Sequence, residues 1–239
     1  MNSLTAALRR YIPHHCELCL EAADKTVNIC RRCREQVIRH GHYCRSCALP
    51  LTATHLDHCG QCLSQPLSID RCISLCDYCP LVAALIHAIK YQQRKPITKL
   101  LSQLLAESVL EQYRHDVLPS LLLPVPLHRY KLFSRGFNPA QQIADVASRE
   151  LKLKMSSNVL RKIKITADQH GLNKKQRLKN LNNAFDCRYQ LAGQSHIVII
   201  DDVITTGTTA NTIAALLKKQ GVKRVDCWSL ARTPSPPIS

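Results

Sequence analysis

The stretch IVIIDDVITTGTT at residues 197–209 places two adjacent acids between an apolar run and a turn rich in threonine. The apolar run predicts a buried strand, and NTIAALLKKQG at 211–221 has the apolar spacing of a helix closed by Gly221. A further strand is predicted for VKRVDCWSL at 222–230. Strand, helix and strand in this order predict an α/β fold with a parallel sheet, in which ligands bind at the carboxyl ends of the strands.

The acids and the turn suit different parts of one ligand. The threonines and Gly207 expose backbone N–H groups ahead of a helix amino terminus, an arrangement that binds phosphate. Asp201 and Asp202 instead suit hydroxyl groups such as a ribose diol, or Mg²⁺ held between diol and diphosphate. The stretch therefore indicates a phosphorylated ribose; an acidic strand end followed by a solvated loop is the alternative. A Walker loop is excluded because its Gly-Lys-Thr ending is absent.

Composition indicates a globular chain. With 239 residues, 45% of them hydrophobic and 21% charged, the length suits one full domain and a small module. No apolar run reaches the roughly 18 residues of a membrane-spanning helix, so no span is expected. The amino terminus lacks the order of a secretory signal, and a cytoplasmic location is therefore expected.

Eleven of the thirteen cysteines lie before position 80, and eight of them form four Cys-x-x-Cys pairs. Without an export signal, this spacing indicates zinc ligands rather than disulfides. Two pairs complete one tetrahedral thiolate shell, so four pairs predict two zinc ions. Interleaved pairing, redox-active pairs and iron–sulfur clusters are alternatives. Sequential pairing would form one site from Cys16, Cys19, Cys30 and Cys33, and another from Cys44, Cys47, Cys59 and Cys62.

Both zinc ions are expected to be structural, because a filled four-sulfur shell leaves no position for substrate. The segment has few apolar residues, so metal binding should supply much of its folding free energy. The remaining cysteines are expected to be small buried apolar residues, with a third metal site as the alternative. They are Cys72, Cys76, Cys79, Cys187 and Cys227.

The chain changes character around SQPLSID, near residues 65–72. Long apolar-periodic segments replace the cysteine-rich turns there, which predicts a zinc module at 1–68 and an α/β domain at 69–239. The elements expected in the second domain are helices at 81–93, 97–113 and 138–151 and a short buried strand at 121–126.

The acidic stretch resembles, position for position, the phosphoribosyl pyrophosphate motif of type I phosphoribosyltransferases. Four other segments extend the likeness to the ComF/GntX family of competence-associated proteins over nearly the whole chain. They are the Cys-x-x-Cys pairs, IHAIKYQ at 86–92, LLLPVPLHRYKLFSRGFNPAQQIA at 121–144 and QHGLNKKQRLKNLNNAF at 169–185. The resemblance implies a double zinc ribbon ahead of a type I phosphoribosyltransferase fold, a mostly parallel sheet flanked by helices. In members from transformable bacteria it also implies handling of incoming single-stranded DNA.

Carried over residue by residue, the resemblance assigns the ribose hydroxyls and any catalysis to Asp201 and Asp202. It assigns the 5-phosphate to Thr205, Thr206, Gly207, Thr208 and Thr209. The segment at 125–129, with Leu127, His128 and Arg129, matches the pyrophosphate loop, although Pro126 lacks one backbone donor. Arg129 and Arg135 suit the diphosphate because guanidinium groups make two-point contacts with phosphate. Lys90 and Tyr91 also match a family motif, although a lysine at a helix end is equally well explained by the dipole.

The formal net charge is +16, and the excess is local: residues 129–179 hold thirteen Lys or Arg against three Asp or Glu. Such a cluster suits a nucleic-acid backbone or phosphorylated small molecules. Its few aromatic residues, Tyr130, Phe133 and Phe137, give modest support for stacking on single-stranded bases. The part LNKKQRLKNL at 172–181 has helical spacing, so some of the charge is explained by a solvated helix face.

Three functions fit these patterns. The first is a competence protein that binds phosphoribosyl pyrophosphate with Mg²⁺ and assists DNA uptake on the cytosolic side of the inner membrane, beside a helicase or channel. The second is a phosphoribosyltransferase of nucleotide salvage or biosynthesis. The third is a nucleic-acid-binding module with a vestigial site. Transfer, if it occurs, requires no nucleophilic side chain, since the acids would stabilise a positively charged ribose.

Overall fold

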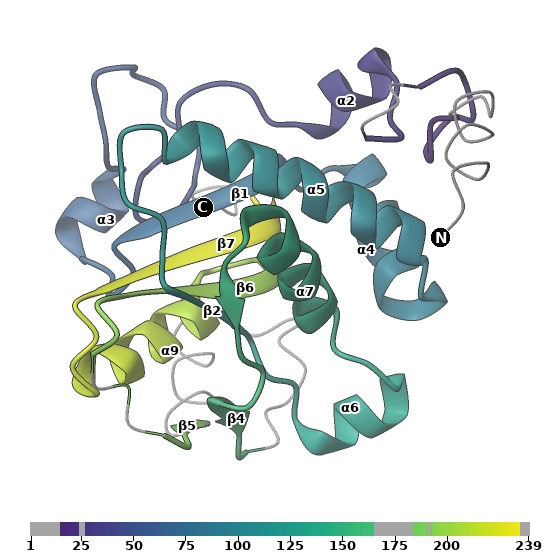
Figure 1. The fold of residues 1–239 in the computed structure, drawn as a ribbon. Helices are drawn as coiled ribbons and strands as arrows, with labels where there is room; N and C mark the ends of the chain where they lie inside the picture. Colours follow the sequence, from purple (N-terminus) through teal and green to yellow (C-terminus); the bar gives the residue numbers. More distant parts are fainter. Residues whose placement is uncertain (1–14, 24–26, 165–183, 190, 192, 235–239) are drawn as a thin grey trace, which may run out of the picture.

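The computed structural model describes residues 15–23, 27–164, 184–189, 191 and 193–234. Its centre is a five-stranded sheet in which every neighbouring pair is parallel, as the sequence predicts (Figure 1). In spatial order the strands are β1 (Arg71–Asp77), β7 (Arg224–Arg232), β6 (His196–Ile204), β2 (Leu121–Pro124) and β3 (Lys154–Met155).

Helices cover both faces of this sheet, which explains why its strands are apolar on both sides. The helices are α4 (Pro80–Gln92), α5 (Lys95–Gln112), α6 (Arg129–Arg135), α7 (Pro139–Leu151) and α9 (Thr208–Lys219) (Figure 1). Val198 and Ile200 of β6 belong to the core beneath α4, α5 and α7, whereas Ile197 and Ile199 belong to the core beneath α9. This division follows from the two-residue period of a strand.

Local sequence explains where these helices begin. Proline occupies the first turn of α4, α5 and α7, where its missing N–H would have no partner. The side chain of Asn138 caps α7 by accepting a hydrogen bond from the N–H of Ala140 at 3.1 Å. In contrast, α9 begins at Thr208 rather than at 211. The second half of the threonine turn is therefore the first turn of the helix.

The acid pair also lies differently from the sequence prediction. Asp201 and Asp202 belong to β6, which continues to Ile204 instead of ending before the acids. The reason is the neighbouring strand, because β7 runs alongside and pairs Asp201 with Ser229 and Val203 with Ala231. The acids therefore have the fixed backbone of a strand rather than that of a loop.

A second, two-stranded antiparallel sheet stands beyond the carboxyl end of β2. It consists of β4 (Leu160–Lys162) and β5 (Phe185–Cys187). The predicted helical segment at 172–181 lies outside the described residues.

The amino-terminal module contains the short helices α2 (Arg31–Val37) and α3 (Gly60–Ser64). Its backbone adds to the outer edge of the sheet: the N–H of Arg39 donates to the carbonyl of Leu75 at 3.0 Å, and the N–H of Cys72 donates to the carbonyl of Arg45 at 2.7 Å. The boundary between 68 and 69 remains a prediction, and β1 begins shortly after it.

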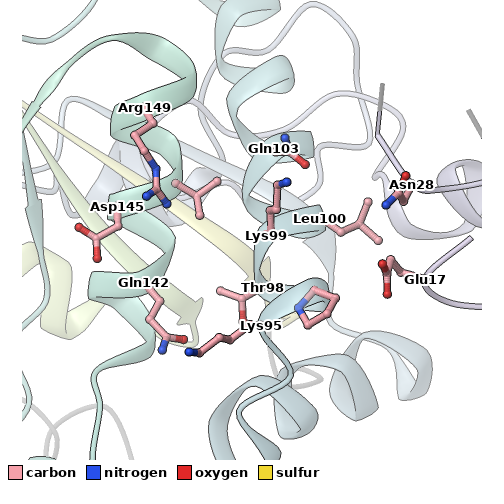
Figure 2. A pocket seen from close by; sticks show the side chains of 12 residues that line it. Glu17, Asn28, Lys95, Thr98, Lys99, Leu100, Gln103, Gln142, Asp145 and Arg149 are labelled. Carbon is pink, nitrogen blue, oxygen red and sulfur yellow. The ribbon is translucent and has the colours of Figure 1, made fainter. Parts of the chain in front are cut away.

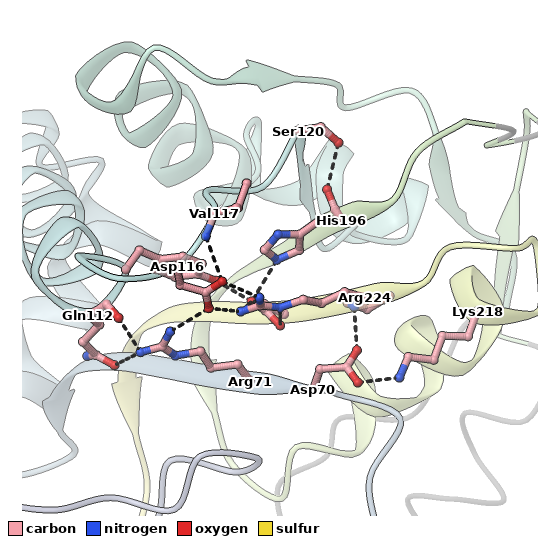
Figure 3. A network of polar contacts seen from close by, with 12 residues as sticks. Asp70, Arg71, Gln112, Asp116, Val117, Ser120, His196, Lys218 and Arg224 are labelled. Carbon is pink, nitrogen blue, oxygen red and sulfur yellow. Dashed lines mark hydrogen bonds and ion pairs between the residues drawn. The ribbon is translucent and has the colours of Figure 1, made fainter.

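Figure 3 shows that charged residues join the strands at their amino ends. The acid pair lies toward the other end of β6. Asp116 accepts hydrogen bonds from both terminal nitrogens of Arg224 at 2.9 and 2.8 Å, and Arg71 lies 3.5 Å away. The fully buried Asp226 accepts from His196 at 2.9 Å and from the hydroxyl of Tyr113. This network fixes the starts of β1, β6 and β7 in register.

Among the described residues, no helix has the length and apolarity to cross a membrane.

Candidate functional site

The acid pair near the carboxyl end of β6 contacts a cation that comes from a helix. The ammonium group of Lys90, in the last turn of α4, lies 3.0 Å from a carboxylate oxygen of Asp202. The two side chains are 24% and 14% exposed, so the ion pair is only partly screened by solvent. The Asp201 carboxylate turns instead to the backbone, where it accepts a hydrogen bond from the N–H of Asp202 at 2.9 Å.

Asp201 titrates unusually for a carboxylic acid. Its pKa is raised to about 7, mainly by burial and next by the charge of Asp202, while the ammonium groups of Lys90 and Lys162 pull it down. A carboxyl group with a pKa near neutrality can accept a proton and release it again at physiological pH. Perturbed acids of this kind are concentrated at functional sites.

The threonine turn follows directly after these acids. Gly207 adopts a left-handed conformation with φ +73°, which favours glycine, and it precedes the first residue of α9. The hydroxyl groups of Thr206 and Thr208 lie 2.7 Å apart. The turn thus brings hydroxyl groups and the amino end of a twelve-residue helix to the strand end that carries the acids.

The segment predicted as a pyrophosphate loop lies beside the acids. The N–H of Val125 donates to the carbonyl of Ile200 at 2.8 Å, and the carbonyl of Val125 accepts from the side chain of Asn138 at 2.9 Å. These contacts fix the start of the segment at the level of the residue before Asp201. His128, which is buried, then caps α6 by accepting from the N–H of Tyr130 at 3.4 Å.

A cavity of about 570 Å³ opens against this segment. Its wall contains the predicted Leu127, His128 and Arg129. Three further cations line it, two from β4 and one that follows β5: Arg161, Lys162 and Arg188. The charge of Lys162 also lowers the pKa of Asp201. An anionic ligand that spans the acids and this cavity would meet several cations.

Of the predicted ligand-binding residues only Leu127, His128 and Arg129 line this cavity. The acid pair, the threonine turn and Arg135 do not, and sequence reasoning missed part of the wall. Arg161 and Lys162 were recognised only as members of a basic cluster, and Arg188 has no local motif that would reveal it. Arg135 does not line the cavity; its guanidinium group lies 5.1 Å from the ring centre of Tyr91 in α4. Arg135 and Tyr91 therefore join α6 to α4.

A larger cavity, of about 720 Å³, contains none of the predicted site residues. Figure 2 shows it between α5, α7 and the first part of the zinc module, with side chains such as Lys99, Asp145 and Glu17 around it. Size alone does not identify the site, because it is the smaller cavity whose wall contains predicted residues.

The eight predicted metal ligands form two clusters in sequential order. Within each cluster the four sulfur atoms lie within 4.8 Å of one another, which excludes interleaved pairing. Four thiols this close fit a tetrahedral zinc shell. The clusters are Cys16, Cys19, Cys30 and Cys33, and Cys44, Cys47, Cys59 and Cys62.

No third metal cluster occurs in the part of the chain that the structure describes. Cys72, Cys76 and Cys227 are buried, as expected for small apolar residues. Cys79 and Cys187 are only partly buried.

Comparison with known families matches each part of the chain to a domain family. Residues 7–63 match the double zinc ribbon domain, and residues 134–238 match the phosphoribosyl transferase domain. Strand β1 and helices α4 and α5 lie between the two matched segments, so Lys90 comes from outside both.

Several relatives are similar to this chain along most of their length. The DNA utilization protein YhgH of Escherichia coli (strain K12) is 36% identical over 225 residues, which cover 93% of this chain and 98% of that protein. Competence protein F of Haemophilus influenzae is 35% identical over 222 residues, covering 91% and 95%. Competence protein ComFC of Bacillus subtilis is 24% identical over 215 residues, covering 86% and 84%. With its double zinc ribbon, its type I phosphoribosyltransferase fold and these relatives, the chain belongs to the ComF/GntX family.

Proposed function

We propose that the protein binds phosphoribosyl pyrophosphate with Mg²⁺ at the carboxyl end of β6. We further propose that it serves the handling of DNA during uptake, on the cytosolic side of the inner membrane. One observation supports the binding proposal: the acid pair and the threonine turn follow one another at the carboxyl end of β6, and the cationic cavity lies against the segment that follows the neighbouring strand β2. The names of the relatives, which refer to DNA utilization and competence, support the cellular role.

Each part of the ligand has a matching group in the protein. The ribose hydroxyls would donate to the carboxylates of Asp201 and Asp202. The 5-phosphate would accept hydrogen bonds from the turn at Thr205–Thr209 and the amino end of α9. The diphosphate would lie toward the cavity, where Arg129 and Lys162 offer positive charge. Mg²⁺ would supply the charge that a diphosphate needs beside two acids.

Transfer of the ribose to an acceptor follows from the same arrangement. Departure of the diphosphate leaves positive charge on the ribose, and the adjacent carboxylates would stabilise that charge. Asp201, with its pKa raised to about 7, suits the acceptance of a proton from an incoming acceptor. Pyrophosphate release on addition of purine or pyrimidine bases would favour a salvage transferase over the role in DNA handling.

Calorimetric titration with phosphoribosyl pyrophosphate, with and without Mg²⁺, tests the binding. The wild-type protein should bind in a Mg²⁺-dependent manner. The double variant Asp201→Asn, Asp202→Asn should bind at least about a hundredfold more weakly, because two charge-assisted contacts are lost. Asp77→Asn is the matched control, since Asp77 ends β1 at the same edge of the sheet but two strands away. Equal affinity of the double variant and the wild type would contradict the binding proposal and favour a nucleic-acid-binding module with a vestigial site.

Direct contact with single-stranded DNA is a second candidate, favoured by helix α6. Phe133 is 92% exposed and Tyr130 is 59% exposed, and the guanidinium group of Arg129 lies 5.5 Å from the Tyr130 ring centre. Exposed rings between cations are what sequence-tolerant stacking on bases requires.

Fluorescence anisotropy with a labelled oligo-dT measures this contact. Tyr130→Ala with Phe133→Ala should weaken binding about tenfold or more, since stacking contributes about 1–3 kcal/mol per base. Tyr78→Ala, which removes a partly exposed ring outside α6, is the control. An unchanged affinity of the double variant would remove α6 from the DNA contact.

A further inference from the structure

Arg232, the last residue of β7, connects two segments that are far apart in the sequence. Only 4% of its surface is exposed. Its Nε donates to the carbonyl of Cys47 at 2.7 Å, within the second cysteine cluster. Its Nη1 donates to the carbonyl of Thr205, the first residue of the threonine turn, and to that of Ile204 at 3.3 Å. We call the segment that contains Cys44, Cys47, Cys59 and Cys62 the second zinc ribbon. A single buried side chain thus joins this ribbon to the threonine turn.

The guanidinium group is held by carbonyl oxygens instead of a carboxylate. Among the described ion pairs none involves Arg232, and the group also donates to the carbonyl of Thr233 at 2.6 Å. Burial of a charge is unfavourable unless hydrogen bonds compensate it, so these carbonyls are strongly constrained in position. The orientation of the peptide group of Thr205 therefore depends on where the carbonyl of Cys47 lies.

A second contact joins the same two regions. The side-chain oxygen of Asn211, in α9, accepts a hydrogen bond from the N–H of Ser68 at 2.6 Å. The N–H of Asn211 donates to the carbonyl of Gly207 at 2.9 Å, inside the turn. Ser68 lies just beyond the second cluster in the chain, so the turn is held to this module from both its ends.

The first zinc ribbon has no such relationship among the described contacts. Its Cys16, Cys30 and Cys33 belong to the core on the α5 side of the sheet. Its ion pair with the sheet domain joins Arg34 to Glu107 of α5 at 2.5 Å. In contrast Ala48, the residue after Cys47, belongs to the same core as Ile204, on the α9 side.

We propose that Arg232 is a positioning residue, which holds the phosphate-binding turn against the second zinc ribbon. Affinity for the 5-phosphate therefore depends on the second cysteine cluster. This inference rests on the proposed function, because it assumes that the turn binds the phosphate of the ribose.

Titration of the full-length, zinc-loaded protein with ribose 5-phosphate and, separately, with pyrophosphate tests the inference. Arg232→Ala should weaken ribose 5-phosphate binding about ten- to hundredfold, the factor expected for a lost hydrogen bond from a charged donor. Pyrophosphate affinity should stay unchanged, because the cavity near Arg129 does not contact Arg232. Free guanidinium ion should restore part of the lost affinity.

Arg224→Ala is the matched control. It removes a partly buried arginine from the opposite end of the same strand, so it should lower stability but leave ribose 5-phosphate affinity unchanged. If Arg232→Ala fails to fold, Asn211→Ala cuts the second contact and should also weaken ribose 5-phosphate selectively. Cys62→Ser, which opens the second cluster, should release one zinc ion and give the same selective loss.

The outcomes separate the two proposals. A wild-type protein that binds neither ligand would overturn the proposed function. A wild-type protein that binds ribose 5-phosphate, with Arg232→Ala or Asn211→Ala equal to it, would overturn the inference and leave the proposed function intact. Equal losses for both ligands would also overturn it, since they indicate general damage. Full retention of affinity in Cys62→Ser after zinc loss would overturn the dependence on the second cluster.

Discussion

The ammonium group of Lys90 lies 3.0 Å from a carboxylate oxygen of Asp202, and this contact joins α4 to β6 across the site. Lys90 thereby supplies positive charge to the acid pair before any ligand arrives. It also lowers the pKa of Asp201, the other member of the pair. A helix outside the matched phosphoribosyl transferase segment therefore contributes to the charge balance of the acid pair.

Lys90→Met should shift the pH dependence of phosphoribosyl pyrophosphate binding. Without the ammonium group the pKa of Asp201 rises further above about 7, so affinity at pH 7 should fall about tenfold, the effect of a partly buried ion pair. Affinity should recover at higher pH, where Asp201 ionises. Calorimetry across pH 6 to 9 measures the shift. Lys99→Met, which removes a lysine on the exposed side of α5, is the control. Identical pH profiles for the wild type, Lys90→Met and Lys99→Met would contradict the prediction.

Asp201→Asn should stabilise the protein at alkaline pH while it removes binding. The folded-state pKa of about 7 lies above the ordinary 3.8, so the folded protein binds the proton more tightly. The resulting loss of stability is absent below pH 3.8, grows up to pH 7 and is complete above it. We expect the variant to gain about 1–2 kcal/mol at pH 8, measured by urea denaturation. A gain as large at pH 4 would show that ionisation is not its cause.

Asp116→Asn should have an effect of the opposite sign and destabilise the protein at neutral pH. Hydrogen bonds from Arg224 are the main reason that the pKa of Asp116 is lowered from 3.8 to about 2. Its stabilising contribution is therefore present above pH 3.8 and is lost as the pH falls through 2. At pH 7 the variant should lose about 1–2 kcal/mol, with ligand affinity unchanged. The exposed Asp57→Asn should change stability by less than about 0.5 kcal/mol.

A chelator should remove the two zinc ions in order. The first cluster contains the exposed Cys19, whereas only Cys59 of the second cluster is partly accessible. The first ion should therefore leave faster, with two kinetic phases in a colorimetric zinc assay. Each loss should lower stability by several kcal/mol, since structural zinc contributes about 10–16 kcal/mol in isolated zinc fingers. Cys19→Ser should abolish the fast phase only, and a single phase in the wild type would contradict this order.

Local patterns were sufficient to predict the parallel sheet, the main helices and the cysteine pairs. The helix expected at 138–151 begins within one residue of α7, because proline and a capping Asn138 mark its start. Spacing could not decide between sequential and interleaved cysteine pairs, since both give four sulfurs per ion. The fold of the intervening chain decides it.

Contacts between distant segments account for what the sequence did not reveal. The acids appeared to follow the strand because polar residues usually end an apolar run, yet pairing with β7 extends β6 to Ile204. Arg232 is one arginine near the end of the chain, and no local pattern shows that it is buried against Cys47 and Thr205. The contact between Arg135 and Tyr91 likewise depends on how α4 packs against α6.

The hydrogen bonds from Arg39 to Leu75 and from Cys72 to Arg45 mean that the zinc module shields the outer edge of β1. This strand, RCISLCD, is short and mostly apolar, and an uncovered edge of that kind is a template for pairing with other chains. Zinc starvation would then do more than unfold a small module. It would turn a dispersed protein into one prone to aggregation, so the metal also safeguards its solubility.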